Sequence, residues 1–351
     1  MPRALARPAQ TEFKQMDILT HGLLGGTLAL SFSRKNELRG AAATGFLAAL
    51  LADADALIRS TTDPLLVLEY HRQFTHALIF IPIGALLMSS ILWPAFKAFG
   101  HPLGFRRIYL YALLGCATSG LLDACTSYGT HLLWPFTTER IAWNIIPIFE
   151  PLFSLILAGA MLIGLRWHKT LPARIGLLLA AAYLSAGWFQ HQRAEYAIRA
   201  TILQRGHQAS KLTVKPTMGN LLLWRSIYRS GGIYHVDAIR IGLAGDTRIY
   251  PGNTVRAFDL PRDLPALSPA TVLHQDIRRF DFFSDGYLAL HPEDPGLLGD
   301  VRYAMLPIST RPLWGIRLDL RHPETHTQFE ASRQMSRQEI NQFIEMLTGM
   351  D

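Results

Sequence analysis

The sequence predicts a multi-domain protein, in which an all-α polytopic membrane domain with about six transmembrane helices is followed by a β-rich α+β soluble domain. Charged residues are unevenly divided, with 25 in residues 1–192 and 36 in the shorter segment 193–351. The first segment contains long uncharged apolar runs, whereas the second contains short runs in which apolar and polar residues alternate. We therefore divide the chain into an N-terminal extension (1–15), a transmembrane domain (16–192) and a soluble domain (193–351).

The composition excludes several other classes of protein. Hydrophobic residues make up 49% of the chain and charged residues 17%, which excludes a disordered protein. The two cysteines, Cys116 and Cys125, are too few for a disulfide framework, and we expect both in core positions. The formal net charge is +7, but the basic residues are scattered through short loops rather than gathered in one stripe. We therefore expect no nucleic-acid partner.

Six segments are apolar enough to be transmembrane helices. A helix needs about 20 mostly apolar residues to cross a bilayer, and residues 77–96 supply such a run without a charge. Two weaker segments precede this run, and three further uncharged segments follow it. The six expected spans are residues 17–33, 40–58, 77–96, 108–122, 151–165 and 175–190.

The soluble domain is expected to consist of antiparallel strands and a closing helix. Alternating segments separated by Gly, Pro and Asp are typical of strands, and we expect the aromatic residues of this domain at strand positions in its core. Residues 336–350 predict an amphipathic helix, with Ser336 as its N-cap and Glu339 completing a capping box. The alternating segments are 233–243, 300–307 and 313–320, and the aromatic residues are Phe280, Phe282, Phe283 and Tyr287.

The basic residues favour one orientation in the membrane. Positive charge in short loops lies mostly on the cytoplasmic side, and the loops after the first, third and fifth expected spans are the more basic ones. We therefore expect the other two loops, and the soluble domain, to face the periplasm or the cell exterior. Basic residues in the N-terminal tail (Arg3, Arg7 and Lys14) favour the opposite orientation.

Ionisable residues gather at one end of the expected spans. With six spans, all of them lie at the same face of the membrane, where such costly side chains are by default functional. Imidazole and carboxylate groups together suit Zn, Mn or Fe. Asp53 and Asp55 are about 200° apart on an α-helix, so only one is expected to be a direct ligand unless the helix has already ended. The residues are Asp17, His21, Asp53, Asp55, His71, His76, Asp123 and Glu150.

Several separated motifs, in this order, resemble the YdjM/YfhP-type inner-membrane metal-dependent hydrolases. The resemblance covers residues 16 to about 320. Glu150-Pro151-Leu152 stands where many members have Asp-Pro-Leu, and Ser119 stands where many have a histidine. Members commonly begin at the Met-Asp motif, so we expect Met16 to be the true start. The motifs are 16–22 (MDILTHG), 52–55 (ADAD), 71–76 (HRQFTH), 121–123 (LLD), 126–130 (TSYGT), 134–136 (WPF), 216–217 (PT) and 220–225 (NLLLWR).

The resemblance implies a multi-pass protein of the bacterial inner membrane that hydrolyses its substrate with a divalent metal, in the first place Zn, with Mn or Fe as alternatives. The metal would activate a water molecule for attack on an ester or phosphodiester, and a site at the membrane face suits a phospholipid or lipid-linked substrate. Asp55 or Glu150 would act as general base, and Arg72 and Arg140 would pair with an anionic group of the substrate. The expected metal-binding residues are His21, Asp53, His71, His76 and Asp123.

Two other functions are compatible with parts of this pattern. A transporter would also carry ionisable residues in its spans, but those residues should continue to both membrane faces, and here they stop at one. A non-catalytic membrane scaffold, whose soluble domain binds a protein partner, would use the same residues for a closed structural metal site.

Overall fold

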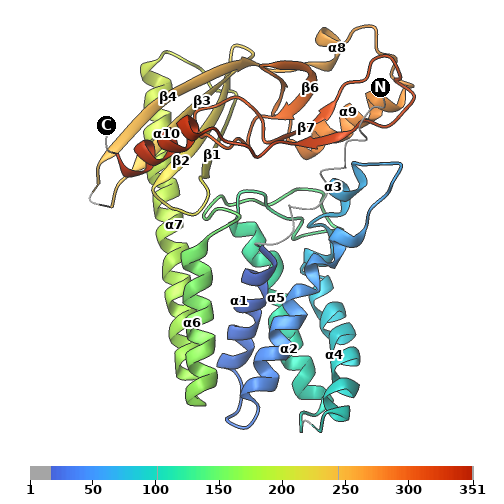
Figure 1. The fold of residues 1–351 in the computed structure, drawn as a ribbon, viewed down its shortest axis with the longest axis vertical. Helices are drawn as coiled ribbons and strands as arrows, with labels where there is room; N and C mark the ends of the chain where they lie inside the picture. Colours follow the sequence, from blue (N-terminus) through green and yellow to red (C-terminus); the bar gives the residue numbers. More distant parts are fainter. Residues whose placement is uncertain (1–16, 101, 244, 350–351) are drawn as a thin grey trace.

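The computed structural model describes residues 17–100, 102–243 and 245–349, with the backbone alone for Asp17, so the predicted extension 1–15 lies outside the described residues. The chain forms a helical bundle that joins two antiparallel sheets at one end, drawn above the bundle in Figure 1. The bundle contains α1 (Asp17–Ser31), α2 (Leu38–Leu50), α4 (Phe80–Ala98), α5 (Phe105–Cys125), α6 (Pro151–Trp167) and α7 (Leu171–Gln204).

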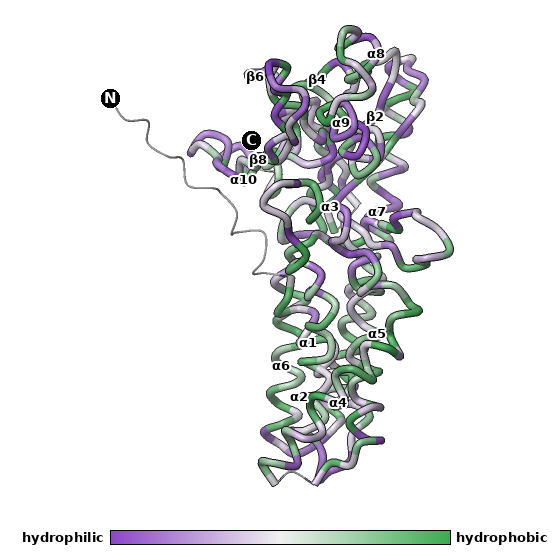
Figure 2. The backbone as a smooth tube through the Cα atoms, turned by 90° about the vertical axis from the view of Figure 1, so that its right-hand side faces the viewer, coloured by the Kyte–Doolittle hydropathy of each residue, from purple (hydrophilic) through white to green (hydrophobic). Residues whose placement is uncertain are grey.

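The expectation of six full spans is only partly met. Within the described residues, α4, α5 and α7 are long and apolar enough to cross a membrane. The apolar helices α1, α2 and α6 have 15, 13 and 17 residues. At 1.5 Å per residue they measure about 20 to 25 Å, which is shorter than the roughly 30 Å hydrocarbon core. The second segment falls short because its α-helix ends at Leu50 and not near residue 58. Figure 2 nevertheless shows hydrophobic residues along the whole bundle.

Glycines let three of these helices pack backbone to backbone. A Cβ atom at Gly45 would lie 2.4 Å from the carbonyl oxygen of Gly25, and one at Gly115 would lie 2.3 Å from the carbonyl oxygen of Gly45. Small residues allow such close crossings in membrane proteins. The crossing of α1, α2 and α5 is therefore fixed, and the start of α1 lies beside the end of α5.

Two irregular segments lie between the bundle and the sheets (Figure 1). Residues 51–79 include the 3-10 helices η1 (Ala52–Leu57) and η2 (Phe74–His76) and the short helix α3 (Leu66–Tyr70). Residues 126–150 connect α5 to α6. The Arg72 carbonyl oxygen joins the two segments, because it accepts hydrogen bonds from the His131 N–H at 3.1 Å and the Thr130 hydroxyl at 2.9 Å. We call these two segments the junction.

Helix α7 continues past the expected domain boundary at residue 193. Ala194, Ile198 and Ile202 repeat at four-residue intervals on one face of the helix, and they pack against Trp224 and Tyr228 of the first sheet. Helix and sheet thus share one core, which anchors the soluble domain to the bundle. The sheet has the order β1 (Lys211–Pro216), β2 (Leu223–Ser230), β3 (Ile233–Ile241), β4 (Thr247–Arg256).

The second sheet is followed by the closing helix. The alternating segments 233–243 and 313–320 contain β3 and β7, and the Ser336–Glu339 capping box forms as expected. Residues 300–307 are not a strand, because β6 ends at Asp300. The elements are β5 (Leu288–His291), β6 (Asp294–Asp300), β7 (Trp314–Arg317) and β8 (Phe329–Ala331), with helices α8 (Leu260–Asp263), α9 (Val272–Phe283) and α10 (Arg337–Thr348).

Three aromatic residues expected on strands lie on α9 instead. Phe280 is buried on this helix, whereas Phe282 is exposed. The sequence favours a helix here because Leu273, Ile277 and Phe280 recur at helical spacing and are buried on one face. The Thr271 side chain also caps the first turn, where it accepts a hydrogen bond from the N–H of His274.

Candidate functional site

Four separate segments bring polar side chains together at the end of the bundle nearest the sheets. His21 lies in the second turn of α1, Asp55 on η1, and Asp123 near the end of α5, while His71 and His76 come from residues 70–76 of the junction. We call these five residues the buried cluster. All except His71 are at most 2% exposed, and the side chain of His71 is 27% exposed.

A glycine allows two of these segments to meet. Gly120 lies one turn before Asp123, and a Cβ atom there would lie 2.1 Å from the carbonyl oxygen of His76. Any side chain at this position would push η2 away from α5. The close approach therefore depends on the absence of a side chain at Gly120.

Asp123 lies at the centre of the buried cluster. Its Oδ1 is 3.2 Å from Nε2 of His21, and its Oδ2 is 3.0 Å from Nε2 of His76 and 3.1 Å from Nε of Arg72. Within the described residues, neither oxygen of Asp123 nor Nε2 of His76 makes a hydrogen bond of acceptable geometry. Buried polar atoms rarely lack hydrogen bonds. Two atoms that bind one metal lie roughly 3 Å apart, so these contacts match atoms aimed at a shared ligand.

Asp55 holds the two histidines of the junction. Its Oδ1 is 3.3 Å from Nδ1 of His71, and its Oδ2 is 3.3 Å from Nδ1 of His76. Oδ2 also accepts hydrogen bonds from the Arg72 N–H at 2.7 Å and the Thr75 hydroxyl at 3.0 Å. A carboxylate at Nδ1 that leaves Nε2 for another partner is the usual arrangement around metal-binding histidines.

The carboxylates change the ionisation of the imidazole between them. Burial opposes a positive charge on His76, but Asp123 and Asp55 outweigh it and raise the pKa of His76 to about 9. Burial likewise opposes a negative charge on Asp55, but His71 and His76 hold the pKa of this carboxyl well below its usual range. Without a metal, His76 therefore carries a proton at neutral pH, and a metal ion would have to displace it.

Arg72 and Tyr128 connect the buried cluster to the space under the sheets. Arg72 is buried, and its Nη1 donates to the Thr126 hydroxyl at 3.1 Å. The Tyr128 ring lies 5.9 Å from the His71 ring and 5.4 Å from Cζ of Arg72. On the cavity side, Cζ of Arg140 lies 4.5 Å from the same ring. Tyr128 is thus the wall between the cluster and a cavity.

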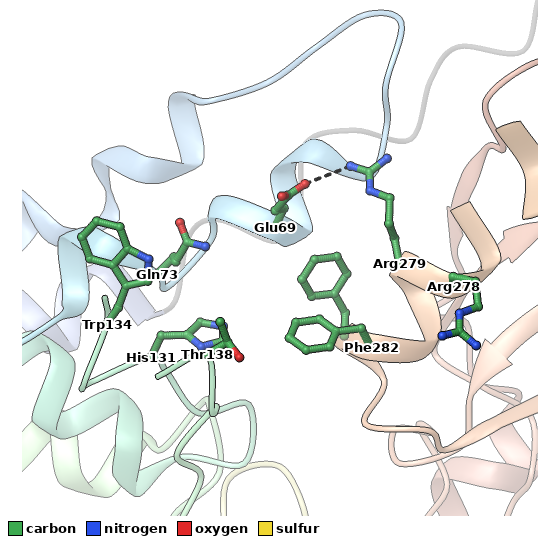
Figure 3. Close-up of a pocket in the computed structure, with 9 residues that line it drawn as sticks. Glu69, Gln73, His131, Trp134, Thr138, Arg278, Arg279 and Phe282 are labelled. Carbon is green, nitrogen blue, oxygen red and sulfur yellow. Dashed lines mark hydrogen bonds and ion pairs between the residues drawn. The ribbon is translucent and has the colours of Figure 1, made fainter. Parts of the chain in front are cut away.

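This cavity, which we call the interdomain cavity, has a volume of about 720 Å³ and lies between residues 127–144 and the soluble domain. A smaller pocket of about 430 Å³ adjoins it, since both are lined by His131, Thr138 and Phe282. In Figure 3, His131 and Trp134 of the junction lie across this smaller pocket from Phe282 on α9. The charged residues of the interdomain cavity are Glu139, Arg140, Lys211, Lys215, Asp281, Asp285 and Arg302.

The other residues predicted for the site lie around the cluster. Asp53 is half-buried on η1, beyond the end of α2, so Asp53 and Asp55 do not share a regular α-helix. Glu150 is buried at the N-cap of α6 near the Tyr183 hydroxyl, and burial raises the pKa of Glu150. Arg140 lines the interdomain cavity rather than the cluster. The side chain of Asp17 lies outside the described residues.

Sequence reasoning overlooked the residues that join the junction to the soluble domain. Lys215 is buried on β1, where its Nζ donates to the Ser127 carbonyl at 2.5 Å and to Oδ1 of Asn144 at 3.1 Å. Burial and the nearby Arg302 lower the pKa of Lys215 to about 7. The Tyr303 hydroxyl donates to the same Ser127 carbonyl at 2.8 Å. Lys215 directly precedes the Pro-Thr motif, which could have drawn attention to it, but nothing in the sequence marks Tyr303.

A second group of metal-ligand side chains lies further from the bundle. Ligand atoms of Asp63, Asp276 and His326 all lie within 4.8 Å of one another, and in the described parts of the chain only this group meets that distance limit. Its two carboxylates are already bonded to the guanidinium of Arg279.

The ligand atoms of the buried cluster do not all lie within 4.8 Å of one another. The imidazoles of His21 and His76 contact different oxygens of Asp123. Its donor set of two imidazoles and a carboxylate nevertheless fits Zn, Mn or Fe by its chemistry.

Comparisons with known proteins place the chain in a family. The family described as YdjM inner membrane protein matches residues 16–194, which contain the bundle up to the middle of α7 and the whole buried cluster. YfhP of Bacillus subtilis (strain 168), named an uncharacterized protein, is 27% identical over 186 residues, which cover 52% of this chain and 54% of YfhP. The chain thus spans only about half the length of that relative.

The inner membrane protein YbcI of Escherichia coli (strain K12) is 26% identical over 173 residues, which cover 43% of this chain and 97% of YbcI. No solved structure matches the chain significantly. Both the family and the relative YbcI are inner-membrane proteins, in agreement with the apolar helices of the bundle. The chain therefore belongs to the YdjM inner membrane protein family and is a protein of the bacterial inner membrane.

Proposed function

We propose that this inner-membrane protein is a metal-dependent hydrolase, whose buried cluster binds a divalent metal and whose substrate enters through the interdomain cavity. The environment of Asp123 carries the proposal. This buried carboxylate contacts two histidine nitrogens at 3.0 and 3.2 Å and Nε of Arg72 at 3.1 Å, and within the described residues its oxygens make no hydrogen bond of good geometry. A metal bound at Asp123 would give this carboxylate a partner, and the two imidazole nitrogens would move closer together to share it, because the cluster does not meet the 4.8 Å limit as it stands.

The contacts suggest which role each residue would have in binding the metal. His21, His76 and Asp123 would hold the metal, with Zn as the first expectation and Mn or Fe as alternatives. Asp55 would fix the ring of His76 through Nδ1, because it already contacts that atom at 3.3 Å. Once bound, the metal would supply an activated water and polarise the bond under attack.

His71 is the side chain best placed to accept a proton. Asp55 is a poorer general base than we expected, because its Oδ2 already accepts two hydrogen bonds. The raised pKa of Glu150 makes its carboxylate the stronger base, but the hydrogen-bond partner described for this carboxyl is Tyr183 and not a residue of the buried cluster. His71 is partly exposed, is held by Asp55 at 3.3 Å and lies against Tyr128 of the cavity wall. It would therefore pass a proton between the cavity and Asp55.

The position of the cluster favours a lipid substrate. The cluster lies at the ends of α1 and α5 nearest the sheets. Figure 2 shows that the bundle is mostly hydrophobic and the soluble domain more hydrophilic, so a lipid can place its headgroup at this boundary while its chains stay in the bilayer. The basic loops after α1, α4 and α6 lie at the opposite end of the bundle (Figure 1). Because such loops lie mostly in the cytoplasm, the cluster and the soluble domain would face the periplasm.

Lipid hydrolysis tests this proposal. The full chain is purified, loaded with Zn or Mn and placed in nanodiscs that contain phosphatidylglycerol, and products are followed by mass spectrometry. We expect lipid cleavage, with a rate reduced about 100-fold or more in His76→Ala. His322→Ala changes an exposed histidine of the soluble domain and serves as the control. Equal rates in parent and His76→Ala, or no cleavage by the metal-loaded parent, would overturn the proposal.

A further inference from the structure

The interdomain cavity contains a group of buried hydrogen-bond donors that lack partners. Within the described residues, both terminal nitrogens of Arg140, Nδ1 of His131 and the hydroxyl of Ser127 are buried without a hydrogen bond. All three residues come from one short stretch of the junction and line the same cavity. Buried polar atoms in native proteins are almost always bonded to protein, water or ligand. Such a concentration makes this cavity a candidate binding site.

The other cations of this cavity already have partners. Nζ of Lys211 donates to the Asp285 carbonyl at 2.6 Å, and Lys215 is bonded to Ser127 and Asn144. Arg302 forms an ion pair with Asp300 at 2.8 Å. These groups contribute positive charge around the cavity but are not free to reorient. Arg140 differs because only the Tyr128 ring is described against its guanidinium.

The chemistry of the unpartnered atoms selects an anion. Guanidinium and hydroxyl groups donate hydrogen bonds, and a neutral imidazole donates from one of its nitrogens. Burial and the nearby Arg140 lower the pKa of His131 to about 4, so this imidazole is neutral at pH 7. The lining also contains three acidic residues, Glu139, Asp281 and Asp285, and burial raises the pKa of Asp281. A phosphate group offers several oxygens to such converging donors.

We propose that the interdomain cavity binds a phosphate group through the donors of Arg140 and Ser127, with the neutral imidazole of His131 beside them. The assignment goes beyond the proposed hydrolase, because these donors would bind phosphate whether or not the buried cluster binds a metal. Tyr128 separates the two sites, since its ring contacts both Arg140 and His71. The phosphate could belong to a lipid headgroup or to a soluble phosphate compound.

Binding to the full chain in an uncharged detergent tests the proposal. Inorganic phosphate is titrated in one arm and dihexanoyl phosphatidic acid in the other, with isothermal calorimetry as readout. We expect at least one probe to bind the parent, with an affinity at least tenfold weaker in Arg140→Gln. Binding of the lipid alone would identify a headgroup site, and binding of both would include soluble phosphates. Arg321→Gln changes an exposed arginine of the soluble domain and should bind like the parent.

A further variant and a chelator control keep the test decisive. Ser127→Ala removes one donor without removing a charge, and it should weaken binding about threefold even if Arg140→Gln fails to fold. Addition of a metal chelator should leave phosphate binding by the parent unchanged, which separates this site from the metal site. Failure of both probes to bind the parent, or equal binding by the parent, Arg140→Gln and Ser127→Ala, would overturn the proposal.

Discussion

Two groups of histidine and aspartate lie near the junction, and they differ in how their polar atoms are bonded. In the Arg279 network, which consists of Arg279, Asp63, Glu69, Asp276 and His326, the guanidinium donates to all three carboxylates at 2.9 to 3.1 Å. In the buried cluster, Asp123 contacts two histidines at similar distances, but its oxygens form no hydrogen bond within the described residues.

From this difference we infer that closeness of ligand atoms is a weaker sign of a metal site than buried atoms that lack hydrogen bonds. Both groups include an arginine, because Nε of Arg72 lies 3.1 Å from Oδ2 of Asp123. The Arg279 network, however, is partly exposed, and such ion pairs contribute about 1 kcal/mol or less. A buried carboxylate without hydrogen bonds is costly instead. We therefore expect the buried cluster, and not the Arg279 network, to bind a metal.

The largest effect should be on the Zn-induced rise in unfolding temperature, when one histidine of each group is replaced by alanine. Zn added to the detergent-purified parent should raise its unfolding temperature, since a ligand at 100 times its Kd stabilises a protein by about 2.7 kcal/mol. The shift should disappear in His76→Ala and persist in His326→Ala. Thermal unfolding followed by circular dichroism measures it. If both variants kept the same shift, the distinction between the groups would be lost.

A smaller effect should follow from adding one methyl group. In Gly120→Ala the new Cβ atom would lie 2.1 Å from the His76 carbonyl oxygen, and overpacking of this kind costs about 1–3 kcal/mol. Gly159→Ala is the matched control, because nothing lies within 4 Å of its new Cβ atom. The unfolding temperature of the metal-free protein should fall only in Gly120→Ala. Parent-like stability there would refute the close approach of η2 to α5.

The smallest effect concerns the Arg279 network. Burial opposes a charge on Asp63, but Arg279 holds the pKa of this carboxyl below its usual value. A depressed pKa stabilises the fold above the unfolded value of about 3.9, and this contribution is lost as the pH falls through the folded value. Arg279→Gln should therefore be less stable than the parent by about 1 kcal/mol or less at pH 7.

That difference should shrink below about pH 4, and the response to Zn should not change. Unfolding temperatures of the parent and Arg279→Gln measured across a pH series provide the test. A difference that widens as the pH falls would contradict the ion pair.

The long apolar segments were the most predictable part of the fold. Residues 77–96 and 108–122 lie mostly within α4 and α5, because an uncharged run in a membrane protein has few alternatives to a helix. Helix ends were less predictable, since α2 stops at Leu50 while α7 runs on to Gln204. Composition does not show where packing against a sheet, as at Ile198, continues a helix into the next domain.

The candidate site was predictable as a set of residues but not as a set of contacts. Motif order and spacing pointed to His21, His76 and Asp123, which the structure brings together at Asp123. Periodicity could not distinguish Asp55 from Asp53, because their positions depend on a 3-10 helix after α2. The cavity was not predictable, since its walls combine residues 127–144 with strands and helix α9 far along the chain.

Metal content measured by elemental mass spectrometry tests the central claim most directly. The parent, Asp123→Asn and Asp276→Asn are purified in detergent, exposed to Zn or Mn and freed of unbound metal, with folding checked by circular dichroism. We predict stoichiometric metal in the parent and in Asp276→Asn, and its loss from folded Asp123→Asn. A folded parent without metal, or equal metal in Asp123→Asn, would contradict the assignment of the buried cluster as a metal site.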